Sequence, residues 1–154
     1  MSTEPLRIYT DGACSGNGYK NAEAGVGVYF YPVEASLKPV SKRVKPEYLQ
    51  SNNVAELFGV YYALKRLYWH CKPRHVHFYI DNQIALNTLL TTRKNGANWA
   101  IIQKIYYLRG ILLEQGFTIT GEWVHSHVKK GEIRTIHNDR NDLADILAKK
   151  SIGR

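Results

Sequence analysis

The sequence predicts an α/β domain with one five-stranded mixed sheet and flanking helices. Two observations lead to this prediction. The first third of the chain contains three β-prone runs with short links, which is typical of an antiparallel meander. The rest alternates helical and β-prone segments, and strands joined through helices favour parallel pairing by right-handed crossovers. The expected order is β-β-β-α-β-α-α-β-α, with two parallel strands added to three antiparallel ones.

The three N-terminal strands are the expected meander. The first is a short run that delivers Asp11 into a Gly-rich turn, and a polar loop follows it over residues 15–24. The second ends at Pro32, because proline cannot donate to a sheet ladder. The third is expected at an edge, where its lysines discourage pairing with another chain. These strands are predicted at residues 8–10, 24–31 and 38–44.

Helices and the remaining strands are predicted from spacing and stop signals. Residues 51–53 open a helix that ends before Pro73, and its apolar face recurs every three or four residues at Val54, Leu57, Tyr61, Leu64 and Tyr68. A last helix should present one apolar face at Leu143, Ile146 and Leu147. We predict strands at 75–80 and 117–125, and helices at 84–90, 99–114 and 139–151.

Length and composition predict a single domain over residues 1–154 that acts on a polyanion. The chain carries 21 Lys and Arg against 13 Asp and Glu, a net charge of +8, which favours a polyanionic partner, with nucleic acid as the first candidate. A merely basic protein has the same balance of charge, so charge alone does not decide between them. Two cysteines form no close metal-ligand set. No apolar run approaches the roughly 20 residues of a membrane span, and no signal peptide is visible. We expect an intracellular monomer, cytoplasmic or, in a eukaryote, nuclear, without membrane partners.

Four carboxylates occupy the edges of predicted elements. Asp11 ends the first strand, Glu56 lies in the first turns of a helix, Asp81 ends the fourth strand, and Asp145 lies early in the last helix. If the first and fourth strands are parallel neighbours, Asp11 and Asp81 emerge side by side where open α/β sheets bind ligands. Gathered carboxylates imply a cation, and oxygen ligands favour Mg²⁺ or Mn²⁺.

Each carboxylate also has a purely structural interpretation. Asp11 precedes a glycine in what can be an ordinary turn. Glu56 can act as the third helical residue after an Asn53 cap, and Asp81 can cap the next helix. Asp145 can pair with Lys149 one turn later. Their joint placement favours the metal site over these separate interpretations.

Four blocks of residues resemble type 1 ribonuclease H, in the order and spacing of that family. The resemblance extends from residue 7 to residue 150 and covers nearly the whole chain. It implies a ribonuclease H-like fold. The blocks are Thr10–Asn17, Asn52–Leu57, Tyr79–Gln83, and Trp123–His127 followed by Asn141–Asp145.

The resemblance implies an endonuclease that hydrolyses the RNA strand of RNA–DNA hybrids. Such enzymes use two divalent ions, here Mg²⁺ or Mn²⁺, and leave 5′-phosphate and 3′-hydroxyl ends. By similarity Asp11, Glu56, Asp81 and Asp145 are the metal ligands, with Asp11 bridging the two ions.

The resemblance also assigns a supporting histidine, His127, to proton transfer or product release. It stands four residues after Trp123, as the family pattern expects. His125 and His137 remain rivals in the same loop. The chain departs from the family here, because the stretch between His127 and Asn141 is long compared with short bacterial members.

Substrate contacts are implied at amides and small side chains near the carboxylates. Such groups reach 2′-hydroxyls and base edges in the wide, shallow minor groove of a hybrid. Ser51 stands where the family often has threonine and offers its hydroxyl to a DNA phosphate. The implied residues are Cys14, Asn17, Ser51, Asn52, Asn53, Gln83 and Asn95.

The basic protrusion that grips the hybrid in many family members is reduced or absent. Only residues 91–98 separate the two helices where it would stand, with Arg93 and Lys94 as its basic remnant, and Trp99 is either a family match or a core residue. We therefore hypothesise that three cations of the last loop supply grip instead. These are Lys129, Lys130 and Arg134.

Two other functions remain open from the residues. One is a nucleic-acid-binding domain that has the fold but no activity, which the four carboxylates disfavour because they repel phosphates. The other is a different nuclease of this fold, such as a junction resolvase. Cys14 and the Asn52-Asn53 pair suit 2′-hydroxyl recognition and disfavour the resolvase.

Overall fold

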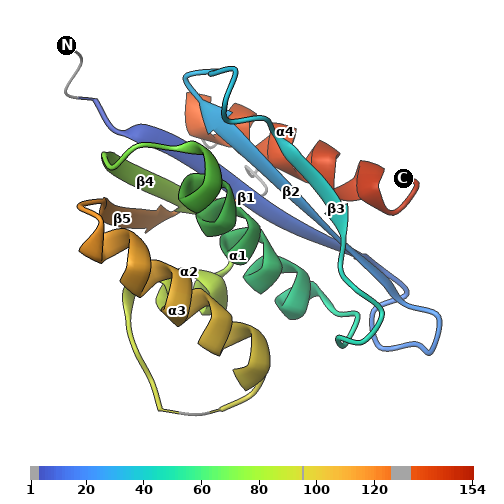
Figure 1. Cartoon of the computed structure of the whole chain (residues 1–154). Helices are drawn as coiled ribbons and strands as arrows, with labels where there is room; N and C mark the ends of the chain where they lie inside the picture. The colour runs from blue at the N-terminus through green and yellow to red at the C-terminus, as the bar shows by residue number, and fades with distance from the viewer. Residues whose placement is uncertain (1–3, 95, 126–132) are drawn as a thin grey trace.

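A computed structural model describes residues 4–94, 96–125 and 133–154. Five strands form one sheet in the order β3-β2-β1-β4-β5, and helices cover both faces (Figure 1). The predicted fold class and order of elements are confirmed. The elements are β1 (Leu6–Ser15), β2 (Glu23–Tyr31), β3 (Val40–Arg43), α1 (Asn52–His70), β4 (His75–Ile80), α2 (Gln83–Leu90), α3 (Trp99–Glu114), β5 (Thr118–Trp123) and α4 (Ile136–Ser151).

Strand pairing follows the predicted meander and crossovers. β1 to β3 pair antiparallel, and β1 pairs parallel with β4, which pairs parallel with β5. β1 is longer than expected, because it stays paired with β2 as far as Ser15 opposite Glu23. Asp11 therefore lies within a strand and does not end it. The turn comes later, where Gly16 and Gly18 have positive φ.

The main core lies between the sheet and α1, with α2 and α3 on the same face (Figure 1). The predicted apolar face of α1 is confirmed at Val54, Leu57 and Leu64, which are buried. Tyr61 is only partly buried, and Tyr68 is exposed near the end of the helix. Trp99 packs against this core at the start of α3.

The last helix, α4, corrects two predictions. It begins at Ile136, three residues earlier than expected, because Thr135 accepts from the backbone of Asn138 while the Asn138 side chain accepts from the Thr135 N–H. Its predicted apolar face is also wrong, since Leu143 and Ile146 are exposed. The buried face instead carries alanines and asparagines.

Small residues bring α4 unusually close to β2. A Cβ placed on Gly27 would lie 1.9 Å from the carbonyl oxygen of Ala144, and Ala144 and Ala148 are fully buried. The amphipathic pattern therefore predicted the wrong buried face of α4. A helix that packs on glycine-rich strands buries its alanines, because bulky side chains cannot fit there.

The link between α2 and α3 contains no helix among its described residues, which agrees with a reduced protrusion. Arg93 and Lys94 lie there, and Arg93 donates to the carbonyl of Ala97. No helix in the described parts of the chain is long and apolar enough to cross a membrane.

Candidate active site

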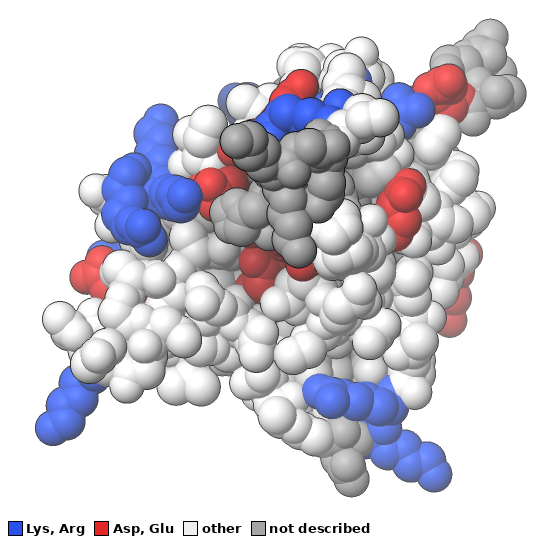
Figure 2. Space-filling view, turned by 180° about the vertical axis from the view of Figure 1, so that it is seen from behind, with Lys and Arg blue, Asp and Glu red and all other residues white. Residues whose placement is uncertain are grey.

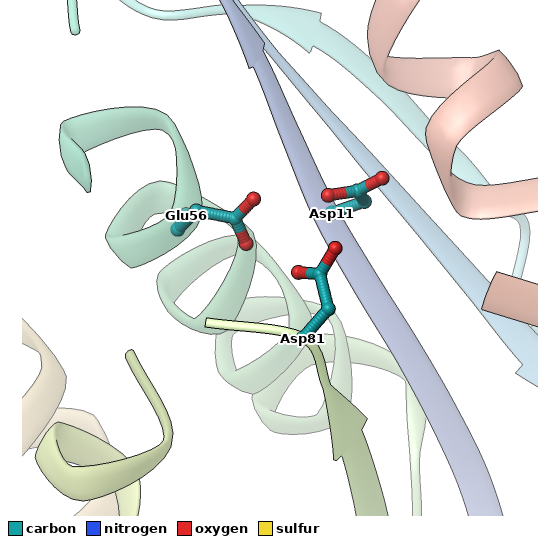
Figure 3. A group of neighbouring side chains, drawn as sticks. All are labelled: Asp11, Glu56 and Asp81. Carbon is teal, nitrogen blue, oxygen red and sulfur yellow. The ribbon is translucent and has the colours of Figure 1, made fainter. Parts of the chain in front are cut away.

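Asp11, Glu56 and Asp81 form a carboxylate trio where β4 ends beside the middle of β1 (Figure 3). One oxygen from each lies within 4.8 Å of the others. Thr10 opposite Ile80 is the last residue pair between β1 and β4, so the next residue of each chain segment is an aspartate. The predicted neighbourhood of Asp11 and Asp81 thus arises where the two strands part, and α1 supplies Glu56.

Gly12 allows α1 to approach β1 closely enough to complete the trio. Its backbone N–H donates to Asp11 Oδ1 at 2.9 Å and to Glu56 Oε1 at 3.0 Å. A Cβ at this position would lie 2.7 Å from the backbone nitrogen of Glu56. Glu56 is not a capping residue, since Ser51 caps α1 by accepting from the Val54 N–H at 3.2 Å.

Asp145, the fourth predicted ligand, lines the same pocket but stands outside the trio. The pocket has a volume of about 360 Å³. Because α4 begins early, Asp145 lies in the middle of the helix, and its carboxylate pairs with Lys149 at 2.9 Å. The pairing suggested by the sequence is therefore present. The pocket is lined by Asp11, Gly12, Asn52, Glu56, Asp81, Asn141, Asp142 and Asp145.

The described part of the protein does not compensate the negative charge that the three carboxylates carry when they are ionised. Burial, followed by repulsion from Asp81, raises the pKa of Asp11 to about 8. Burial also raises the pKa of Glu56 well above its usual value, and that of Asp81. No described group donates to the buried oxygens Glu56 Oε2 and Asp81 Oδ1. Orphaned buried carboxylate oxygens fit a hard divalent cation, which would supply the missing partners.

Comparison with known proteins places this arrangement in a family. The family model described as RNase H matches residues 3–152. The chain belongs to the RNase H family. Together with the ribonuclease H1 relatives and structures described next, this match confirms the predicted resemblance to type 1 ribonuclease H.

Curated relatives of this RNase H chain carry the name ribonuclease H1. The rat protein is 29% identical over 161 residues, with 97% of this chain and 52% of that protein covered. The human protein is 28% identical over 154 residues, with 93% and 48% covered. This chain therefore spans about half the length of the curated relatives that it matches.

Solved structures agree on the fold. The N-terminal RNase H domain of a Mycobacterium tuberculosis protein superposes with a TM-score of 0.67 and 22% identity, covering 96% of this chain and 93% of that one. A compost-derived RNase H1, LC11, solved in complex with an RNA/DNA hybrid, superposes with a TM-score of 0.68 and 20% identity, covering 96% of both chains.

Asn141 belongs to the pocket of this RNase H chain, although no site role was predicted for it. It is only 1% exposed, and no described group accepts from its side-chain nitrogen. Its position four residues before Asp145 is the signal that places both on one side of α4. Asp142 also lines the pocket and pairs with Arg134.

The predicted substrate amides lie around the start of α1 and α2. Asn17 accepts from the backbone N–H of Asn52 at 3.2 Å, which ties the β1–β2 hairpin to α1. Asn53 accepts from the side chain of Asn82 at 3.2 Å. Asn82, and not Asp81, caps α2.

Two further substrate candidates differ in exposure. The Cys14 thiol faces inward and contacts the carbonyl of Gln50 at 3.6 Å. Gln83 is exposed at the first position of α2. Asn95, the remaining candidate, lies outside the described residues.

The candidate histidines differ in their surroundings. His137 stacks on Tyr79 with ring centroids 4.2 Å apart, and its Nδ1 lies 2.6 Å from the Tyr9 hydroxyl. Its surroundings are therefore those of a structural residue that holds the start of α4 on the sheet. The His125 ring lies 4.0 Å from that of Trp123. His127 lies outside the described residues.

Two basic groups of this RNase H chain pair with carboxylates that line the pocket, Lys149 with Asp145 and Arg134 with Asp142. Figure 2 shows Asp and Glu atoms near the middle of one face and also at its periphery, with most Lys and Arg groups toward the periphery.

Arg134, just before α4, pairs with Asp139 at 2.6 Å and with Asp142, but these side chains are about half exposed or more, so the pairs are weak and screened. Its part in gripping the hybrid stays a prediction, and Lys129 and Lys130 lie outside the described residues.

Proposed function

We propose that this chain is an endonuclease that hydrolyses the RNA strand of RNA–DNA hybrids with the help of two divalent cations. The observation that carries the proposal is the trio of Asp11, Glu56 and Asp81, with buried oxygens that lack donors. Membership of the RNase H family supports it, as do relatives named ribonuclease H1 and a structural neighbour solved with an RNA/DNA hybrid. The proposed products carry 5′-phosphate and 3′-hydroxyl ends.

Asp11, Glu56, Asp81 and Asp145 are the residues that would hold two Mg²⁺ or Mn²⁺ ions, with Asp11 as the ligand common to both. When bound, the ions lower the pKa of water to give a hydroxide and stabilise the leaving 3′-oxygen. The Gly12 N–H keeps Asp11 and Glu56 oriented toward the pocket. Asn141 offers an amide donor at the pocket wall, where a phosphate oxygen can accept from it.

Substrate discrimination would rest on amides near the trio. Asn52 lines the pocket, and Asn17 and Asn53 are attached to its rim by hydrogen bonds. We propose that these groups and Gln83 read sugars and base edges of the minor groove, with backbone groups at Cys14. Ser51 and Asn95 are proposed to contact the DNA strand, and His127 to assist proton transfer or product release.

One assay tests the function. The protein is incubated with labelled hybrid, duplex DNA and duplex RNA, each with Mg²⁺ and with chelator. We expect the protein to cleave only the RNA strand of the hybrid and to leave 5′-phosphate and 3′-hydroxyl ends. Cleavage should be lost with chelator and in the Asp11→Asn variant. Glu122→Gln is the matched control, because Glu122 of β5 pairs with His77 of β4 and does not line the carboxylate pocket, so it should leave cleavage unchanged. Hybrid binding without cleavage by the wild-type protein would overturn the enzymatic proposal in favour of a binding domain.

Single-turnover cleavage rates test which histidine, His127 or His125, assists catalysis. We expect His127→Ala to slow cleavage about 10²-fold, the lower range for a general acid or base. His125→Ala should leave the rate near that of wild type. A larger loss in His125→Ala than in His127→Ala would reverse the assignment.

A further inference from the structure

A basic cavity of about 640 Å³ lies beside the β1–β2 hairpin, on a different set of residues from the carboxylate pocket. Its lining combines the end of the hairpin with the segment between β3 and α1. The side chains that matter are Lys20, Glu23, Arg43, Lys45 and Gln50.

The cavity has an excess of positive charge. Arg43 pairs with Glu23 at 3.3 Å, and both side chains are exposed, so this pair is weak and screened. Lys20 and Lys45 form no ion pair among the described residues. Burial lowers the pKa of nearby Lys42, and the charge of Lys45 is among those that lower it further. The charge of Lys45 therefore acts on Lys42.

Gln50 makes one wall of the cavity rigid. Its side-chain oxygen accepts from the Ala24 N–H at 2.9 Å, and its amide nitrogen donates to the carbonyls of Lys45 and Tyr48, each at 3.0 Å. Val44 N–H donates to the Ala24 carbonyl at 2.9 Å on the same edge. A preformed wall costs little ordering when a ligand binds.

The same segment continues directly into the carboxylate pocket. Gln50 is followed by Ser51, the cap of α1, and by Asn52, which lines the pocket. Asn17, which accepts from the Asn52 N–H, stands three residues before Lys20. A strand that lies over the hairpin amides would thus pass next to the lysines.

We propose that Lys20 and Lys45 bind a backbone phosphate of the hybrid in this cavity, and so extend the substrate interface along the β1–β2 hairpin. The inference rests on the proposed function. It identifies a source of grip in a chain with a reduced protrusion. Lysine binds phosphate as a point charge and needs no bidentate geometry, which suits two flexible side chains at a cavity rim.

Salt-dependent binding tests the cavity. Asp11→Asn proteins, which should not cleave, are titrated with labelled hybrid between 50 and 200 mM salt. Each phosphate contact contributes about −0.9 to the slope of log affinity against log salt, which is roughly threefold in affinity over this range. We expect the double variant that combines Lys20→Ala with Lys45→Ala to have a slope that is shallower by about 0.9.

A matched pair of lysines outside the cavity controls for net charge. Lys38 and Lys72 are exposed and do not line it, so Lys38→Ala with Lys72→Ala removes the same charge elsewhere. This control should keep the wild-type slope. An equal flattening in both double variants, or an unchanged slope in Lys20→Ala with Lys45→Ala, would overturn the cavity site.

Different results would contradict the proposed hybrid cleavage and the proposed phosphate site in the cavity. Wild-type cleavage of hybrid RNA together with an unchanged slope in the cavity variant removes only the cavity site. Absence of hybrid cleavage by the wild-type protein removes the proposed function first. Thermal unfolding of the cavity variant should match the wild-type curve, because both lysines are exposed.

Discussion

The backbone N–H of Gly12 donates to Oε1 of Glu56 at 3.0 Å, across the contact between β1 and α1. This bond joins the first strand to the helix that carries the second carboxylate. It exists only because Gly12 has no side chain to hold α1 away. The position of Glu56 relative to Asp11 is therefore set by a backbone contact.

Gly12→Ala should disrupt the site and lower stability. Its Cβ would lie 2.7 Å from both the Glu56 backbone nitrogen and the Ala55 Cβ, so β1 and α1 must separate. We expect a loss of about 2–4 kcal/mol in the free energy of unfolding, as for other overpacked cores. Chemical denaturation measures the loss, and hybrid cleavage should fall with it. A variant of wild-type stability would show that the contact can relax freely.

Asp11→Asn should stabilise the metal-free protein at pH 8. The pKa of Asp11 is about 8 in the folded state, against about 3.9 in unfolded chains. Between these values the folded state keeps a proton that the unfolded chain has released, so the free energy of unfolding falls as pH rises. Replacing the titratable carboxyl by an amide abolishes this proton uptake and should restore on the order of 1–3 kcal/mol, the scale of an uncompensated buried polar group.

The pH dependence distinguishes this effect from a general change. Near pH 4 the wild-type and Asp11→Asn proteins should have similar melting temperatures, because Asp11 is protonated when folded. The difference should grow toward pH 8 in buffer with chelator. A wild-type stability that rises over this range would contradict the raised pKa.

Mg²⁺ should stabilise the protein and displace protons near pH 7. Ligand carboxylates bind metal in the ionised form, and the pKa of Asp11 keeps a proton on it at that pH. At 100 times the dissociation constant the gain is about 2.7 kcal/mol. Thermal unfolding measures this gain, and calorimetry in two buffers of different ionisation enthalpy counts the protons. Asp11→Asn should lose both signals, and a wild-type melting temperature indifferent to Mg²⁺ would contradict the metal site.

Gly27→Ala should detach α4 from β2. The added Cβ would lie 1.9 Å from the Ala144 carbonyl oxygen and 2.6 Å from the Ala148 nitrogen. We expect a loss of about 3 kcal/mol or more, in the upper range of overpacking. Gly110→Ala is the control, because Gly110 is exposed in α3 with open space at its Cβ, and it should gain up to about 1 kcal/mol. Equal effects of the two substitutions would refute the packing argument.

Much of the fold was predictable from local pattern. β4 and α3 lie at the predicted bounds, because strand alternation, the three- and four-residue helical spacing and the turn residues are properties of short segments. α4 was less predictable. Its start depends on a cap between Thr135 and Asn138, and its buried face depends on glycines of β2 far away in the chain.

By itself, the sequence determined the order of elements and the family resemblance, and it singled out four carboxylates as candidate metal ligands. Only the tertiary structure decided which of these carboxylates lie together. The pairing of β1 with β4 ends at Thr10 and Ile80, so Asp11 lies beside Asp81. Gly12 has no side chain, so α1 can approach β1 and place Glu56 next to them. Asp145 lines the same pocket from α4, and its carboxylate also pairs with Lys149. Such distances depend on strand register and helix approach, which are long-range contacts that no local pattern encodes.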